Sequence, residues 1–302
     1  MCCLFGIYDY GHSLTAAQKK RLVSALAVAS EDRGTDATGI AYNHNGHLTV
    51  YKRPYPAHLM RFRLPDDAVC IMGHTRMTTQ GDEKYNYNNH PFEGTAGIPF
   101  ALAHNGVLYN DLTLRKNKNL PYTRIETDSY VAVQLLAQQD DLSFRSIRSA
   151  VEPLRGTLTL SVLDSRDNPY IIKGNNPLTL YHFPRMGLFV YASTEQILKK
   201  GLKKGMPRME QPFEVMLREG DILRIDRQGQ YTVERFDTRN LWDGTAHFSW
   251  PYWDVYAGQD EYINDLKSVA SAYGYTPHDI DLFLSYGLCP EEIEEILCCG
   301  EV

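Results

Sequence analysis

The sequence has no long hydrophobic segment. Its longest apolar runs, residues 98–103 and 188–192, are far shorter than the roughly 18 residues that a membrane-spanning helix needs. The first six residues also lack the features of a signal peptide. We therefore expect no membrane partner and a location in the cytoplasm.

The sequence has no excess of positive charge. It contains 31 Lys and Arg against 37 Asp and Glu, a net charge of −6 at pH 7. This balance argues against a nucleic-acid partner, and the basic clusters Arg115–Lys118 and Lys199–Lys204 are interpreted as solvated loops or helix ends. The sequence has neither a GxGxxG nor a GxxxxGK[ST] loop, so it offers no common nucleotide-binding motif. We predict no cofactor.

The six cysteines form no repeated CxxC pair and no secreted disulfide framework. We infer a reducing compartment, where a free thiol can be catalytic. His74, His90 and His104 with Cys70 match no common zinc spacing, so we predict no metal site. The adjacent Cys298 and Cys299 are interpreted as small apolar residues that end a helix.

Hydrophobic periodicity predicts strands at both ends of the main part of the chain and helices in its middle. A helix is expected over Thr15–Ser30, opened by a capping box of Thr15 and Gln18, and Asn45-Gly46 indicates a hairpin. Two more helices are predicted at 127–139 and 143–154. Strands are predicted at 3–8, 39–42, 48–52, 69–74, 99–104, 157–162, 170–173, 178–182, 188–191, 214–217, 221–225 and 230–236. The order favours an α+β protein in which helices cover packed antiparallel sheets.

The composition changes near residue 240. All three tryptophans, Trp242, Trp250 and Trp253, lie in one stretch with Tyr252 and Tyr256. Short helical patterns follow at 261–273, after Thr276-Pro277 and after Cys289-Pro290, where proline is favourable at a first helical position. We predict a main domain at 1–240 and an ordered, small helical C-terminal extension at 241–302.

Cys2 follows the initiator methionine directly, so removal of one residue gives it a free α-amine. Such an amine has a reference pKa of about 7.7–8.0, low enough to accept the proton of the same residue's thiol. Nucleophile and base then belong to one residue. Most proteins with cysteine at this position make no use of it, so further residues must support this interpretation.

Three other segments supply groups that fit such chemistry. Asn105-Gly106 can point an amide and a backbone N–H at a developing oxyanion, although it is equally a turn. Arg76 ends an apolar segment and can bind a carboxylate, or is simply exposed. Asp128 can bind an ammonium group, or stabilise a helix N-terminus. Together, Arg76 and Asp128 would hold both charges of a free amino acid.

These residues lie within an ordered series of motifs that resembles the class II glutamine amidotransferase domain, a group of N-terminal-nucleophile (Ntn) hydrolases. The nearest forms are the glutaminase domains of glucosamine-6-phosphate synthase and amidophosphoribosyltransferase. The resemblance covers residues 2 to about 225. The motifs are Met1–Gly6, Arg33–Ile40, Gly73–Thr79, Asn89-His90-Pro91, His104–Val107 and Thr127-Asp128-Ser129.

The resemblance implies a four-layer αββα sandwich and hydrolysis of the side-chain amide of L-glutamine through a Cys2 thioester, with release of ammonia. It implies that Cys2 is the nucleophile, that Asn105 and Gly106 form the oxyanion hole, and that Arg33 orders the site. It further assigns the substrate carboxylate to Arg76, the substrate ammonium to Asp128, and a place in the pocket lining to Thr79. Two departures stand out: Cys3 replaces a usual glycine and Met77 a common aromatic residue.

Three functions remain open at this stage. The ammonia acceptor is expected on another chain, because about 60 residues after position 240 are too few for the usual second domain. A stand-alone hydrolase of a different amide or of a γ-glutamyl compound is the first alternative, and a non-catalytic binding protein with this fold is the second. The sequence carries no signal of an oligomeric state.

Overall fold

The computed structural model describes residues 2–207, 210–241, 263, 266–285, 288, 293 and 296–297. The chain divides into two compact units, Met1–Thr245 and Ala246–Val302, and each is described by itself. None of the helices in the described residues combines the length and the apolar character that crossing a membrane requires.

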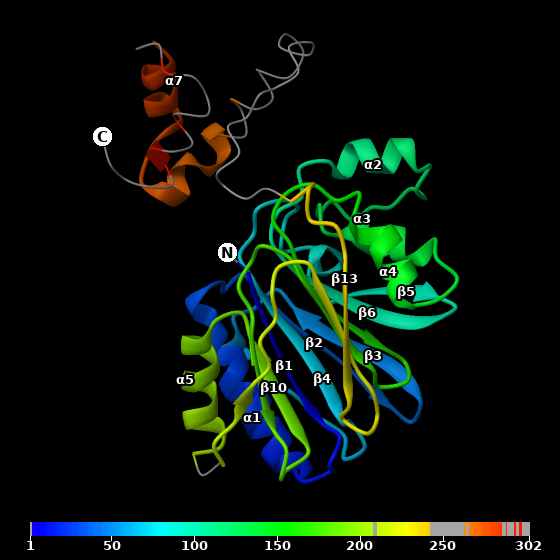
Figure 1. Cartoon of the computed structure of the whole chain (residues 1–302). Helices are drawn as coiled ribbons and strands as arrows, with labels where there is room; N and C mark the ends of the chain where they lie inside the picture. Colours follow the sequence, from blue (N-terminus) through cyan, green and yellow to red (C-terminus); the bar gives the residue numbers. More distant parts are fainter. Residues whose placement is uncertain are drawn as a thin grey trace. The chain divides into compact units, whose positions relative to one another are not determined.

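Two antiparallel sheets form the centre of the first unit (Figure 1). The first sheet has seven strands in the order β11-β9-β10-β1-β4-β2-β3. Their bounds are β1 Cys3–Asp9, β2 Ala37–His44, β3 His47–Arg53, β4 Cys70–Arg76, β9 Thr179–Phe183, β10 Leu188–Ala192 and β11 Phe213–Glu214. Strand β1 lies between β10 and β4, with Phe5 opposite Ala192 and Cys3 opposite Thr75.

The second sheet has six strands in the order β13-β12-β8-β7-β6-β5. Their bounds are β5 Phe92–Ala96, β6 Ile98–Asn105, β7 Thr159–Asp164, β8 Pro169–Lys173, β12 Asp221–Ile225 and β13 Tyr231–Arg235. Between the two sheets lies an apolar layer that includes Leu4, Met72, Ala103, Leu163 and Tyr191.

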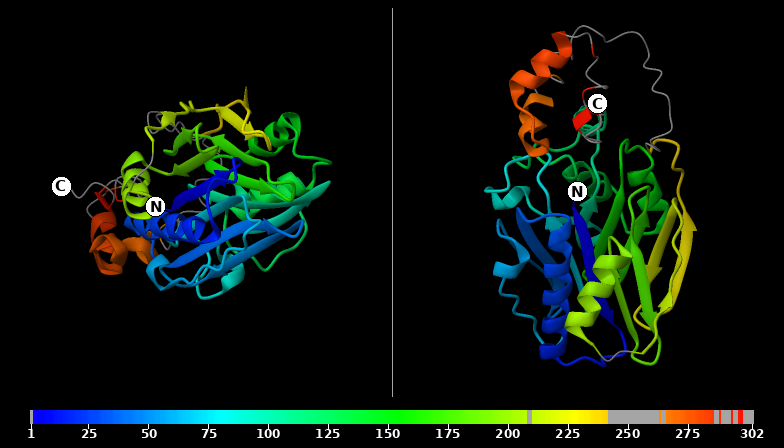
Figure 2. Two further views of the ribbon diagram at one scale, coloured as in Figure 1. Left: turned by 90° about the horizontal axis from the view of Figure 1, so that it is seen from below. Right: turned by 90° about the vertical axis from the view of Figure 1, so that its left-hand side faces the viewer.

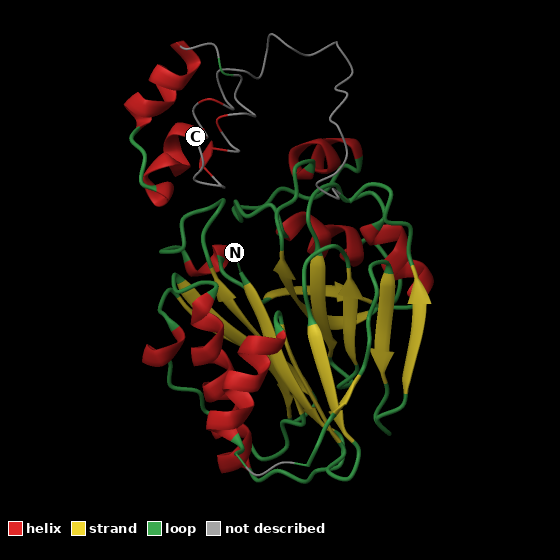
Figure 3. Ribbon diagram, turned by 60° about the vertical axis from the view of Figure 1, so that its left-hand side comes forward, coloured by secondary structure: helices red, strands yellow, loops and turns green. Residues whose placement is uncertain are grey.

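Helices cover the outer face of each sheet, as the views in Figures 2 and 3 show. Helices α1 (Ala16–Ala29) and α5 (Glu195–Gly205) pack Leu22, Leu26 and Leu198 against the first sheet. Helices α3 (Tyr130–Ala137) and α4 (Phe144–Val151) pack against the second. Short helices occupy the connections: α2 Asp111–Asn117, η1 Ser30–Asp32, η2 Ala57–Leu59 and η3 Asn86–Asn88. This is the αββα order of layers, so the predicted fold class is confirmed.

Local sequence signals account for several element boundaries. The capping box at α1 is present, with the Gln18 N–H donating to Thr15 Oγ1 and the Thr15 N–H to Gln18 Oε1. Asn45 and Gly46 both have positive φ, 51° and 76°, and join β2 to β3 as the hairpin prediction required. Strand β5 and helices α2 and α5 are not among the elements predicted from the sequence. The two basic clusters lie at the end of α2 and within α5.

The second unit contains η4 (Ala270–Tyr273) and α7 (Pro277–Ser285). Helix α7 begins at Pro277 as predicted, and the Thr276 hydroxyl accepts the Asp279 N–H at 3.3 Å. Its small core comprises Leu266, Ala270, Ile280, Ile293 and Leu297. The predicted aromatic stretch Trp242–Tyr256 lies outside the described residues, as do Cys289-Pro290 and Cys298-Cys299. The division at residue 240 stays a prediction.

Candidate active site

Cys2 lies just before β1 and is partly exposed as a residue. Its Sγ donates to the carbonyl oxygen of Met77 at 3.4 Å, and its own carbonyl oxygen accepts from Arg33 Nε at 3.0 Å. Burial raises the pKa of the Cys2 thiol, whereas the hydrogen bond to Met77 and the charge of Arg76 act in the opposite direction. The thiol is therefore a weak acid here and needs a base to become a nucleophile.

Arg76 ends β4 beside Cys2, because its neighbour Thr75 pairs with Cys3. Only 2% of Arg76 is exposed, so the interpretation of this residue as a surface arginine is wrong. Its guanidinium donates to Asn89 Oδ1 at 2.6 Å and to the carbonyl oxygens of Gln80 and Gly81. The guanidinium is thus held in place from the loop that follows its own strand.

The segment that carries Arg33 packs directly on the backbone of Arg76. A Cβ added at Gly34 would lie only 2.5 Å from the Arg76 carbonyl carbon, so a side chain there would force the two segments apart. The Asp36 carboxylate accepts the Thr78 N–H at 2.7 Å and fixes the start of the loop after β4. Two separate sequence motifs therefore form one wall beside Cys2.

Asn105 and Gly106 stand at the end of β6, on the opposite sheet. The Asn105 side chain is 1% exposed, and its Nδ2 lies 3.4 Å from Ser193 Oγ, which also accepts the Leu4 N–H at 2.8 Å. Ser193 thereby connects Asn105 to the strand that begins beside Cys2. Asn105 Oδ1 is buried and has no protein partner.

Gly106 has a φ of 149°, and a Cβ at this position would lie 2.0 Å from the carbonyl oxygen of Thr157. Only glycine fits a backbone that comes this close to a neighbouring segment. Asn105-Gly106 is therefore not a simple surface turn. It is the point at which the end of β6 comes into close contact with the backbone of Thr157.

Asp128 precedes α3 and is 1% exposed. Its Oδ2 accepts the Leu108 N–H at 2.6 Å, from a segment 20 residues earlier, and its Oδ1 lies 3.3 Å from the Ser129 hydroxyl. The carboxylate is thus bound to the segment after Asn105-Gly106. Burial raises the pKa of Cys2 and lowers that of Arg76, and the negative charge of Asp128 acts to raise both, so the three groups share one electrostatic environment.

Three buried histidines lie behind these groups. His74 and His90 are stacked with ring centroids 4.2 Å apart, His74 Nε2 lies 3.0 Å from the His104 carbonyl oxygen, and the His104 N–H donates to His90 Nδ1. Burial lowers the pKa of all three, that of His74 to about 3. Within the described residues, no group of three or more His, Cys, Asp or Glu side chains is placed to hold a metal ion.

Three further residues singled out from the sequence are Thr79, Met77 and Cys3. Thr79 is exposed on the loop after β4, and its place in the pocket lining stays a prediction. Met77 is 39% exposed. Cys3 is fully buried among the residues that pack against α1 and α5, so its larger side chain points away from the space between the sheets.

The predicted site residues do not include Ser193 or Asn89, and the pairing of Ser129 with His104 was not predicted. Asn89 and Ser129 belong to motifs named above, which is a usable signal, but Ser193 has none.

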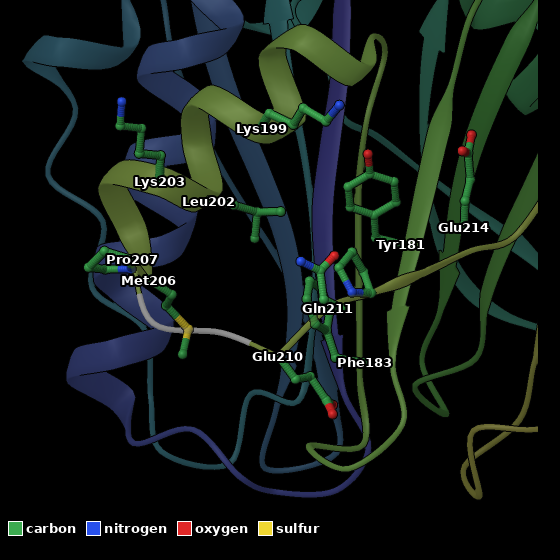
Figure 4. Close-up of a pocket in the computed structure, with 11 residues that line it drawn as sticks. Tyr181, Phe183, Lys199, Leu202, Lys203, Met206, Pro207, Glu210, Gln211 and Glu214 are labelled. Carbon is green, nitrogen blue, oxygen red and sulfur yellow. The ribbon is translucent and has the colours of Figure 1, made fainter.

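An open pocket of about 500 Å³ lies between α5 and residues 210–214 (Figure 4). Lys199, Lys203, Glu210 and Glu214 are among its lining residues, and none of the predicted site residues is.

Comparison with known proteins identifies relatives of both sequence and structure. No family model matches the chain. Glutamine–fructose-6-phosphate aminotransferase (isomerizing) of Caldanaerobacter subterraneus is 32% identical over 149 residues, which are 47% of this chain and 24% of that protein. The Halalkalibacterium halodurans protein of the same name is 27% identical over 72% of this chain and 38% of its own length. The chain thus spans well under half the length of these relatives.

Solved structures share the fold. Glutamine phosphoribosylpyrophosphate amidotransferase from B. subtilis, complexed with ADP and GMP, aligns with a TM-score of 0.61 at 19% identity, over 79% of this chain and 50% of its own. A structure described as the allosteric regulatory enzyme of purine biosynthesis aligns with a TM-score of 0.62 at 18% identity, over 78% and 49%. The motif series, the four layers and these relatives agree, and the chain carries a class II glutamine amidotransferase domain with the Ntn hydrolase fold.

Proposed function

We propose that the protein hydrolyses the side-chain amide of L-glutamine at Cys2 and releases ammonia for an acceptor. The observation that carries the proposal is that two buried side chains of opposite charge, Arg76 at the end of β4 beside Cys2 and Asp128 before α3, lie near enough to the Cys2 thiol to act on its charge. One cation and one anion beside a nucleophile match the carboxylate and the ammonium group of a free amino acid. The relatives named for glutamine chemistry support the same substrate.

Each group has a role in the proposed reaction. Removal of Met1 frees the α-amine of Cys2, which takes the thiol proton that burial otherwise retains. The thiolate attacks the amide carbon, and Asn105 Nδ2 with the Gly106 N–H stabilises the oxyanion. Ammonia leaves, and water cleaves the thioester to glutamate. Arg33 holds the Cys2 carbonyl oxygen and thereby fixes the orientation of the nucleophile.

The proposed partner is an ammonia-using enzyme on a separate chain. We further propose that residues 241–302 bind this partner, because Trp and Tyr are favoured at interfaces and this segment holds all three tryptophans of the chain, which lie outside its described part. Copurification of a partner with the intact chain, and its loss on deletion of 241–302, would support this arrangement. A location in the cytoplasm stays a prediction.

Glutamate release from L-glutamine by purified, Met1-processed protein tests the function. Cys2→Ala is the informative variant and Cys70→Ala the matched control, because Cys70 is a buried free cysteine at the start of β4. We expect release by the wild type and by Cys70→Ala and none by Cys2→Ala. Undiminished release by Cys2→Ala would contradict the proposal, and release only from another amide would assign a different hydrolase.

A further inference from the structure

Four polar groups, three of them on buried residues, form a continuous chain of hydrogen bonds behind the proposed ammonium site. The Thr157 carbonyl oxygen lies 3.1 Å from His104 Nε2, and His104 Nδ1 lies 2.8 Å from Ser129 Oγ. Ser129 Oγ lies 3.3 Å from Asp128 Oδ1. His104, Ser129 and Asp128 are at most 3% exposed. Water has little access to these atoms, so the protein itself must satisfy their hydrogen-bonding capacity.

The hydrogen-bond partner of Nε2 and the neutral state of the ring fix the tautomer of His104. A carbonyl oxygen only accepts, so His104 Nε2 carries a hydrogen and donates to Thr157. Burial disfavours the charged imidazolium and outweighs the opposing effect of Asp128, so the pKa of His104 lies below its ordinary value. In the neutral ring, Nδ1 is then an acceptor and requires a donor.

Ser129 has one hydroxyl proton and two acceptors within reach. His104 Nδ1 at 2.8 Å is closer than Asp128 Oδ1 at 3.3 Å, so the proton goes to the neutral histidine. Asp128 Oδ2 is meanwhile occupied by the Leu108 N–H. One carboxylate oxygen is thus bound by the protein, while Oδ1 keeps its lone pairs for another donor.

We propose that His104 is a positioning residue that holds the Ser129 proton away from Asp128 and keeps Asp128 Oδ1 free to accept from the ammonium group of the substrate. This inference rests on the proposed function, because it deepens the assignment of Asp128. Without the Nδ1 acceptor, the hydroxyl proton turns to Asp128 Oδ1 and competes with the ammonium group. Substrate affinity falls while the reacting groups stay in place.

Paired substitutions separate this role from general support of the fold. His104→Gln retains an amide near the Nε2 position that can donate to Thr157, but it removes the Nδ1 acceptor. We expect a three- to tenfold higher KM for glutamine with kcat within twofold, roughly the effect of one competing hydrogen bond. Adding Ser129→Ala removes the competing proton and restores KM to within about twofold of wild type.

A substrate without an amino group tests whether the effect of His104→Gln depends on the ammonium group. Glutaramate has the amide and one carboxylate of glutamine but no ammonium group, so His104→Gln leaves its KM unchanged. His182→Gln is the matched control, a histidine on β9 that contacts Tyr10 rather than the site. A raised KM that Ser129→Ala fails to restore, or an equal rise for glutaramate, overturns the inference.

The tautomer can be measured directly on the wild-type protein by ¹⁵N NMR of His104. We expect the neutral form with hydrogen on Nε2 at pH 7.5, and an imidazolium or an Nδ1–H tautomer overturns the inference even where the variants fail to fold. Absence of any Cys2-dependent glutaminase in wild type would instead refute the proposed function. Normal glutaminase with the wrong tautomer would refute this inference alone.

Discussion

Arg33 Nε donates a 3.0 Å hydrogen bond to the backbone carbonyl oxygen of Cys2, although the two residues are 31 positions apart. This bond holds the residue that carries the nucleophile in place. A lysine at position 33 keeps the charge but loses the planar guanidinium with its donor at Nε.

We therefore expect Arg33→Lys to lower kcat for glutamine about tenfold, the equivalent of about 1.4 kcal/mol. Steady-state kinetics measures the effect. Arg53→Lys is the control, because Arg53 is exposed and also donates to a backbone carbonyl oxygen, that of Lys52. A folded Arg33→Lys protein with wild-type kcat would show that this bond does not order the nucleophile.

Asn105 is expected to supply a side-chain donor to the oxyanion. Asn105→Ala removes the Nδ2 group and should lower kcat by roughly two to three orders of magnitude, with little change in melting temperature. Asn110→Ala is a matched control, since Asn110 Nδ2 donates to the Pro153 carbonyl oxygen outside the site. Similar kcat values for the two variants would remove Asn105 from the proposed oxyanion hole.

Much of the fold follows from the sequence because short-range patterns determine it. The α1 capping box, the Asn45-Gly46 hairpin and the start of α7 depend on neighbouring residues alone. The predicted helix at 127–139 is shorter in the structure, where α3 spans Tyr130–Ala137. The side chains of Asp128 and Ser129 bond to Leu108 and His104 instead of capping the helix. Such tertiary bonds leave no periodic signal.

The candidate site also contains residues that the sequence predicts and others that only the folded chain identifies. Chemical type and motif predict Cys2, Arg76, Asn105 and Asp128. In the structure these residues lie at the ends of strands or just before an element, in one electrostatic environment. Ser193 was missed because a serine after an apolar strand has no distinctive spacing. Its contacts reach 189 residues to Leu4 and 88 residues to Asn105, so only the folded chain identifies it.

Glycine at position 106 is expected to be indispensable. Gly106→Ala would combine a φ of 149° with a Cβ that lies 2.0 Å from the Thr157 carbonyl oxygen, so it should lower the free energy of unfolding by well over 1 kcal/mol and abolish activity. Gly46→Ala measures the loss of stability that a positive φ alone causes, because its φ is 76° and no atom lies within 4 Å of an added Cβ. If urea unfolding shows equal decreases in the free energy of unfolding for Gly106→Ala and Gly46→Ala, the predicted clash with Thr157 is contradicted.

The buried histidines predict a loss of stability in acid. His74 has an ordinary pKa of 6.5 that burial lowers to about 3, so below pH 6.5 the unfolded chain binds a proton that the folded protein does not. The resulting stabilisation is present above pH 6.5 and is lost as the pH falls toward 3. Between pH 7 and 5 the loss from this residue is about 2 kcal/mol.

His74→Gln keeps a side-chain amide that can donate to the His104 carbonyl oxygen but does not titrate. Its free energy of unfolding should therefore fall about 2 kcal/mol less than that of wild type between pH 7 and 5. Urea titrations at the two pH values measure this difference. Parallel losses in both proteins would mean that His74 is not buried in its neutral form.

The central claim is that Cys2, with a free α-amine, is the nucleophile. Its most direct test is peptide mass spectrometry after reaction with 6-diazo-5-oxo-L-norleucine, a glutamine analogue that alkylates nucleophiles. We predict one label, on the thiol of Cys2 at a chain start without Met1, and loss of glutamate release in proportion to labelling. Labelling of Cys3 or another residue, or labelling of Cys2 in a protein that still carries Met1, would contradict the account.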